Sequence, residues 1–148
     1  MPTRLLAGLL ALALGMNAVA ADRKFINAEQ GSAAQATRPI SDAVLVGNTL
    51  YISGHLGIDP ATNRAATDPA VEARLVMDRV KHTVEAAGLS MDDVVSIQVF
   101  CTDLALYETF NNVYRTYFPH GFPARAFLGV NTLLRGSHFE VLGVAVRK

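Results

Sequence analysis

The chain has 148 residues, 51% of them hydrophobic and 18% charged, which suits a single folded domain. Lysine and arginine together number 13, as do aspartate and glutamate, so the basic surface typical of nucleic-acid-binding proteins is not expected. One cysteine excludes an internal disulfide, and the 4 histidines lack the spacing of a metal-binding motif. We therefore expect neither a nucleic-acid partner nor a metal site.

The first twenty residues have the pattern of a secretory signal peptide. Arg4 precedes an apolar segment at 5–14, and Ala18 and Ala20 occupy the −3 and −1 positions of a cleavage site. Because the apolar segment is shorter than the roughly 20 residues that span a bilayer, we favour cleavage after Ala20 over a retained anchor. This predicts a signal peptide at 1–20 and a periplasmic or secreted mature protein without stable membrane association.

The rest of the chain divides into a short lead-in and one domain. Residues 21–38 include a small, polar stretch without periodicity and are predicted to be a flexible lead-in to a domain at 39–148. Two β-prone runs at 43–46 and 49–53 surround a two-residue turn, which predicts a hairpin that ends at Gly54.

Two helices and three strands are predicted in the rest of the domain. Asp68 and Pro69 begin a helix that Gly88 ends, and a second helix runs up to Pro119. Period-two or apolar runs predict three more strands, at 94–101, 124–132 and 139–146. This order implies an α+β fold with two helices on one face of a mixed sheet. Because the strands are apolar on both sides, we expect other subunits to cover the opposite face.

Two charged residues at the beginning of predicted strands are candidates for chemistry. Arg125 follows Pro123 at the start of an apolar strand, where its guanidinium could grip a carboxylate; the alternative is a surface or salt-bridging arginine. Glu140 opens the last strand, where a dry environment would raise its pKa and suit it to proton transfer. An ion pair with a neighbouring arginine is the alternative for Glu140.

The end of the hairpin supplies weaker candidates. Gly54 would let a ligand approach the backbone, and His55 is either a proton carrier or a solvated loop histidine. Cys101 lies in a period-two strand and is interpreted as a buried small hydrophobic residue.

Several short motifs occur in order along the chain. They include Pro39-Ile40-Ser41-Asp42-Ala43, Ile52-Ser53-Gly54, Glu85-Ala86-Ala87-Gly88, Val99-Phe100-Cys101-Thr102-Asp103-Leu104, Asn111-Asn112-Val113-Tyr114, Phe122-Pro123-Ala124-Arg125 and Glu140. These motifs resemble those of the Rid family, also called the YjgF/YER057c/UK114 or reactive-intermediate deaminase family. Each motif alone is weak, but their order over 39–148 is specific. The resemblance implies a chorismate-mutase-like fold of the bacillus type, assembled as a homotrimer with a barrel-like centre and three sites between subunits.

The resemblance also implies an activity and roles for residues. The activity is hydrolysis of 2-imino acids, such as 2-iminopropanoate or 2-iminobutanoate, to 2-keto acids and ammonia without a cofactor. Arg125 matches the arginine that binds the substrate carboxylate, and Glu140 matches the acid that positions the attacking water. Asn111, Ser53 and Gly54 match positions of the pocket wall.

Four residues depart from the family pattern. Ile40 stands where the family usually has tyrosine and His55 where it usually has glutamine, while Ala126 and Phe127 replace a serine and a small residue or cysteine. Ile40, His55 and Phe127 are therefore expected to line a substrate pocket of altered range. The alternative functions are a non-catalytic binding module for small carboxylates, which uses the same interface cleft, and a protein-interaction or ribonuclease-like role.

Overall fold

The computed structural model describes residues 22–28 and 38–148, so the predicted signal peptide and part of the predicted lead-in lie outside the described residues. Six strands form a mixed sheet in the order β1-β2-β3-β8-β6-β7. Their bounds are β1 Arg23–Ile26, β2 Ala43–Val46, β3 Thr49–Leu56, β6 Val94–Cys101, β7 Ala124–Gly129 and β8 Phe139–Val146. Neighbouring strands are antiparallel except β6 and β7, which are parallel.

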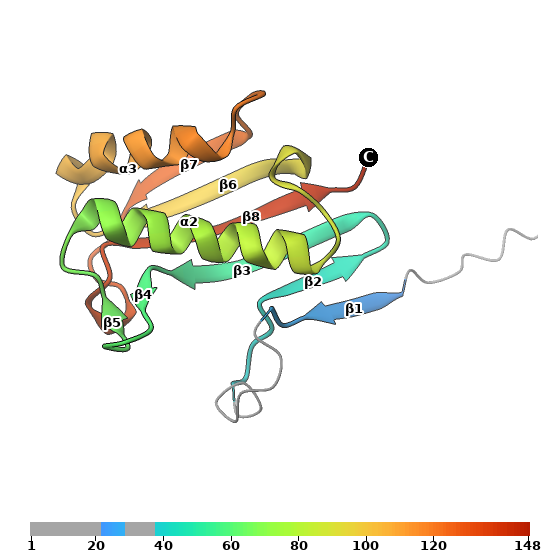
Figure 1. The fold of residues 1–148 in the computed structure, drawn as a ribbon, viewed down its shortest axis with the longest axis horizontal. Coiled ribbons are helices and arrows are strands. Elements are labelled where there is room, and N and C mark those ends of the chain that lie inside the picture. Colours follow the sequence, from blue (N-terminus) through green and yellow to red (C-terminus); the bar gives the residue numbers. More distant parts are fainter. Residues whose placement is uncertain (1–21, 29–37) are drawn as a thin grey trace, which may run out of the picture.

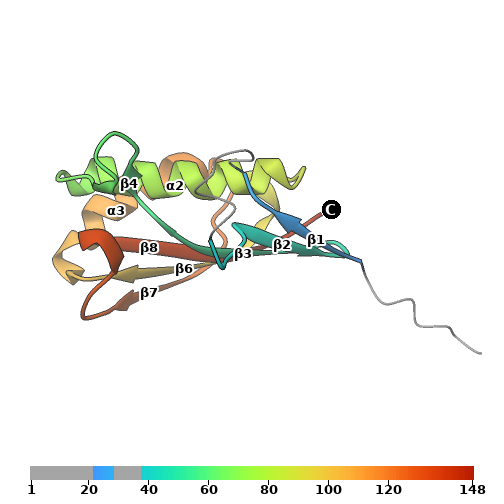
Figure 2. The same cartoon turned by 90° about the horizontal axis from the view of Figure 1, so that it is seen from below.

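Two helices, α2 (Pro69–Ala86) and α3 (Tyr107–Tyr114), cover one face of this sheet (Figures 1 and 2). The side chain of Asp68 caps α2 by accepting from the backbone N–H of Ala70 at 2.8 Å, as the sequence predicted. Gly88 follows the helix with a φ of +74°, a conformation that favours glycine. The α+β fold class, with a mixed sheet and two helices on one face, is confirmed. None of the described helices is long and apolar enough to cross a membrane.

The hydrophobic core lies between the helices and the sheet. Along β8, Phe139 and Val141 are fully buried under the helices, whereas Glu140 between them is half-buried and faces the other side. Cys101 is buried in the core, which confirms its interpretation as a small hydrophobic residue. The face opposite the helices carries apolar side chains that remain exposed, among them Tyr51 at 55% and Leu128 at 41%.

Two predicted boundaries are wrong at the N-terminal side. Strand β1 lies inside the predicted flexible lead-in and pairs with β2, and Ile26 is buried in the core. Four residues are too few to show a clear alternation, so only the pairing with β2 makes this segment a strand. Strand β3 continues beyond Gly54 to Leu56, because an irregularity between Ile52 and His55 shifts the register instead of ending the strand.

Two further differences concern loops. The predicted strand at 124–132 ends at Gly129, and single 3-10 turns flank α3 at Leu104–Leu106 and Arg115–Tyr117. The polar loop after β3 contains a small antiparallel pair, β4 (Ile58–Asp59) and β5 (Arg64–Ala65). Neither strand has enough residues for sequence periodicity to reveal it.

Candidate functional site

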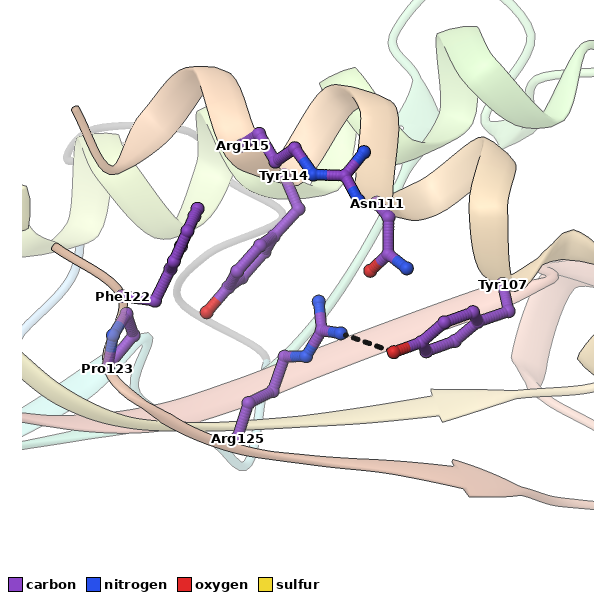
Figure 3. A pocket seen from close by; sticks show the side chains of 7 residues that line it. All are labelled: Tyr107, Asn111, Tyr114, Arg115, Phe122, Pro123 and Arg125. Atoms are coloured by element: carbon purple, nitrogen blue, oxygen red, sulfur yellow. Dashed lines mark hydrogen bonds between the residues drawn. The ribbon is translucent and has the colours of Figure 1, made fainter.

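A cavity of about 280 Å³ opens between α3 and the beginning of β7 (Figure 3). It is lined by Tyr107, Asn111, Tyr114, Arg115, Phe122, Pro123 and Arg125. Helix α3 supplies Tyr107, Asn111 and Tyr114 at steps of four and three residues, so all three side chains lie on one face of the helix. Arg125 reaches this cavity from the second position of β7.

The guanidinium of Arg125 is surrounded by aromatic rings. Its Cζ lies 4.5 Å from the ring centroid of Tyr114 and 5.7 Å from those of Tyr107 and Phe127, distances typical of cation–π contacts. Its Nη2 donates to the Tyr107 hydroxyl at 3.4 Å, while Nη1 is buried without a hydrogen-bond partner. No acidic side chain among residues 22–28 and 38–148 forms a salt bridge with Arg125. The charge is therefore available for an anionic ligand.

Tyr114 and Asn111 add buried polar groups at the same cavity. The Tyr114 hydroxyl is buried without a hydrogen-bond partner. Burial raises the pKa of Tyr114 to about 12, although the Arg125 charge acts in the opposite direction, so the hydroxyl is protonated at neutral pH. Asn111 is also buried and contributes its amide to the cavity wall, next to Arg125 (Figure 3). The structure thus brings Asn111 and Arg125, two of the predicted site residues, to the same cavity.

Glu140 and Gly54 form a second group. A methyl group added at Gly54 would clash with Oε1 of Glu140 and lie 3.0 Å from its Cδ, so the carboxyl group lies directly against the Gly54 backbone. Gly54 is needed here because a larger residue would displace the carboxyl group. Gly54 and Glu140, two of the predicted site residues, therefore lie next to each other.

Arg125 and Glu140 are not brought together within one chain. In the sheet, Arg125 is the partner of Ile97 on β6, whereas Glu140 is the partner of Phe100, three residues further along the same strand. Because successive side chains of a strand alternate between the two faces, an offset of three places them on opposite faces. Arg125 lies on the helix-covered face and Glu140 on the open face.

Of the remaining predicted pocket residues, Ser53 and Ile40 are not part of the Arg125 cavity, and Phe127 lies beside it without lining it. The Ser53 hydroxyl donates to the backbone carbonyl of Ser41 at 2.8 Å, and Ile40 is 47% exposed in the loop before β2. The Phe127 ring packs edge-on against Tyr107, with centroids 5.0 Å apart, and is partly buried against the core. Phe127 therefore supports the ring of Tyr107, which lines the cavity, and does not line it itself.

His55 is not a solvated loop residue, and it belongs neither to the Arg125 cavity nor to the group formed by Glu140 and Gly54. It is buried between β3 and α2, and its Nε2 lies 3.1 Å from the Thr83 hydroxyl. The reason is the register shift after Ile52, which turns His55 toward the helices. Burial of the imidazole, aided by the charge of Arg79, lowers the pKa of His55 to about 4.

This burial predicts a loss of stability in acid. The neutral imidazole is favoured in the folded state, so its contribution is complete above the unfolded-state pKa of about 6.5 and is lost as pH falls toward 4. The wild-type unfolding free energy is expected to fall by up to about 3 kcal/mol over this range because of His55. Urea denaturation at several pH values should show a flatter profile for His55→Gln. His120→Gln, a control at an exposed histidine, should keep the wild-type slope; an equally steep slope in His55→Gln would contradict the assignment.

Sequence reasoning missed three polar side chains. Tyr107 and Tyr114 could have been found from their spacing with Asn111 on one helix face. Glu72 gives no such signal, yet its carboxylate is fully buried and accepts hydrogen bonds from the backbone N–H groups of His138 and Phe139. Among the described residues, no three His, Cys, Asp or Glu side chains are grouped so that they could hold a metal ion.

The two-layer fold and the arginine cavity define an α+β domain with a candidate anion site, and comparison with known proteins identifies its family. A family model described as Endoribonuclease L-PSP matches residues 30–147. The chain is 38% identical over 126 residues to 2-iminobutanoate/2-iminopropanoate deaminase of Bos taurus. This match covers 84% of this chain and 90% of the bovine protein. The chain is 42% identical over 104 residues to a RutC family protein of Sulfurisphaera tokodaii, covering 70% and 83% respectively.

Solved structures agree with this relationship. The crystal structure of the YjgF gene product from E. coli matches with a TM-score of 0.76 and 36% identity, covering 84% of this chain and 99% of that one. E. coli TdcF with bound serine matches with a TM-score of 0.75 and 32% identity, covering 84% and 99%. The chain belongs to the L-PSP family, which is the Rid (YjgF/YER057c/UK114) family that the sequence motifs resemble.

Proposed function

We propose that this protein is a cofactor-independent deaminase that hydrolyses 2-imino acids, such as 2-iminopropanoate or 2-iminobutanoate, to 2-keto acids and ammonia. The observation that carries the proposal is the Arg125 guanidinium, which has a buried Nη1 without a partner and no acid paired with it among the described residues. A carboxylate is the ligand that such a fork binds best. Relatives named 2-iminobutanoate/2-iminopropanoate deaminase support the reaction class.

The proposal includes a homotrimer with three sites between subunits. Arg125 and Glu140 lie on opposite faces of the sheet in one chain, so one can act with the other only across an interface. Exposed apolar side chains on the open face, including Tyr51 and Leu128, supply a surface that association would bury. Each site then combines the Arg125 cavity of one subunit with the Glu140 and Gly54 group of a neighbour.

In the proposed reaction, Arg125 binds the carboxylate of the imino acid and thereby fixes the adjacent C=N carbon. Glu140 from the neighbouring subunit accepts a hydrogen bond from water and takes up its proton as the oxygen attacks that carbon. Glu140 returns this proton to the nitrogen, which gives a carbinolamine. The carbinolamine hydroxyl then gives up its proton to the nitrogen as the C–N bond breaks, so the carbonyl forms and ammonia leaves. Export to the periplasm or medium is part of the proposal and rests on the sequence of residues 1–20.

The reaction is tested with the chain from residue 21 onward, an amino-acid oxidase that generates 2-imino acids, and semicarbazide as a competing trap. The proposal expects the protein to lower semicarbazone yield and raise 2-keto acid yield for small side chains. Thermal stabilisation by 2-keto acids without any turnover would instead support the carboxylate-binding module. RNA cleavage that copurifies with the protein through several steps would support the ribonuclease-like role.

Gly54→Ala tests the placement of Glu140. The added methyl group should displace the Glu140 carboxyl group and reduce kcat for imine hydrolysis by about tenfold to a hundredfold. The melting temperature should change little, because the atom in the way is the end of a flexible side chain. In a Glu140→Ala background the same glycine substitution should have no further effect on kcat. A full additional loss in that background would show that Gly54 acts independently of Glu140.

A further inference from the structure

The Arg125 guanidinium is hydrogen-bonded to the hydroxyl group of Tyr107. Nη2 of Arg125 donates to the Tyr107 hydroxyl oxygen at 3.4 Å, as the dashed line in Figure 3 shows. Because the tyrosine oxygen accepts this hydrogen bond, its own proton remains available for another acceptor. The pair therefore offers both an N–H and an O–H donor at one cavity.

We propose that Tyr107 is a further carboxylate-binding residue. It positions the guanidinium of Arg125, and its hydroxyl group donates a hydrogen bond to the same carboxylate. This inference rests on the proposed function. Tyr107 is not part of the sequence motifs quoted above, and the family resemblance assigns it no role. The proposal assigns substrate affinity to Tyr107 and leaves the proton transfer to Glu140.

The Tyr107 ring is held in place without help from Arg125. Its centroid lies 5.0 Å from that of Phe127 at an interplanar angle of 87°, an edge-to-face contact. Phe127 in turn lies 5.6 Å from Phe110, which is fully buried and packs on Phe139 at 5.0 Å. This series of aromatic contacts fixes the hydroxyl relative to the core, so Arg125 is oriented before a ligand arrives.

The surroundings of the guanidinium favour a carboxylate over a neutral ligand. The Tyr114 ring, at 4.5 Å from Cζ, is the nearest of the aromatic rings around the charge, and Nη1 has no protein partner. Among the described residues no carboxylate forms a salt bridge with Arg125, so the bound group must supply the negative charge. A planar group with two acceptor oxygens can take one hydrogen bond from Arg125 and one from Tyr107.

Tyr107→Phe removes only the hydroxyl and keeps the ring contacts with Phe127. We expect KM for the 2-imino acid to rise about tenfold while kcat stays within about twofold, because the lost contact is to a group that does not react. The matched control is Tyr117→Phe, whose hydroxyl donates to Asp78 at 2.6 Å and lies outside the cavity. The control should lose stability and keep the wild-type KM.

A second measurement separates this inference from the proposed activity. Isothermal titration calorimetry with pyruvate, the 2-keto acid that corresponds to 2-iminopropanoate, should show about tenfold weaker binding to Tyr107→Phe than to wild type. Weakened pyruvate binding without any imine hydrolysis by the wild type would uphold the role of Tyr107 and reject the proposed reaction. Imine hydrolysis with equal KM and equal pyruvate affinity in both proteins would overturn the role of Tyr107 alone. Absence of pyruvate binding to the folded wild type would overturn it as well.

Discussion

Replacing Arg125 by alanine is expected to lower kcat/KM for 2-imino acid hydrolysis by at least about a hundredfold, since each factor of ten corresponds to about 1.4 kcal/mol of lost stabilisation. The Arg125 guanidinium has a buried Nη1 without a hydrogen-bond partner at the cavity, whereas Arg115, the other arginine of the lining, is already paired with Asn112 and Glu108. The loss should be measured from initial rates of 2-keto acid formation. Circular dichroism and size-exclusion chromatography should show an unchanged fold and assembly.

Arg74→Ala is the matched control for this loss of positive charge. Arg74 lies on α2 with an exposed side chain and does not line the cavity. Its substitution should leave kcat/KM within about twofold of wild type, as expected for a surface position. Equal activity of Arg125→Ala and Arg74→Ala would reject Arg125 as the carboxylate-binding residue.

Replacing Glu72 by alanine should give the largest loss of stability, about 3–5 kcal/mol of unfolding free energy. The Glu72 carboxylate is completely buried and accepts hydrogen bonds from the backbone N–H groups of His138 and Phe139, at 2.7 and 2.9 Å. It also accepts from Nδ1 of the His138 ring at 2.7 Å. Alanine would leave these donors without an acceptor at the entry to β8, and each buried, unpaired donor carries a large desolvation cost.

Urea denaturation at fixed protein concentration measures this effect, because the proposed association of subunits would also contribute to apparent stability. Glu72→Gln keeps one acceptor oxygen and should lose less than Glu72→Ala. If Glu72→Ala unfolded within about 1 kcal/mol of wild type, the hydrogen bonds at the start of β8 would not stabilise the native state as described.

Most of the regular structure could be predicted because its signals are local. The N-cap at Asp68, the stop at Gly88 and the period-two pattern of β6 each involve residues close in the chain. Strand β1 could not be predicted in this way, because its existence depends on pairing with β2 about twenty residues away. The register shift in β3 likewise depends on the contact with β8.

The candidate site was predictable in its chemistry but not in its arrangement. Arg125 and Glu140 are visible as charged residues in apolar strands, yet their opposite faces follow from the pairing of both strands with β6. For His55 the environment itself could not be predicted. A polar residue after a glycine suggests a loop, but the fold buries His55 against Thr83. Glu72 has an ordinary place in a helix sequence, and only the tertiary contact with the loop before β8 reveals its role.

The central claim is that each site takes Arg125 from one subunit and Glu140 from its neighbour. The most direct measurement mixes two variants of greatly reduced activity, Arg125→Ala and Glu140→Ala, in equal amounts after mild denaturation and refolding. If subunits assort at random, about a quarter of the interfaces combine an intact Arg125 with an intact Glu140, so about a quarter of wild-type activity should return. As a control, the double variant mixed with wild type should also give about a quarter under the interface model, but about half if each chain carries a whole site.

Recovery of about a quarter of the activity from the two single variants is the predicted result. No recovery from the single variants, together with about half activity from the control mixture, would contradict a shared site and place the two residues in independent roles within one chain.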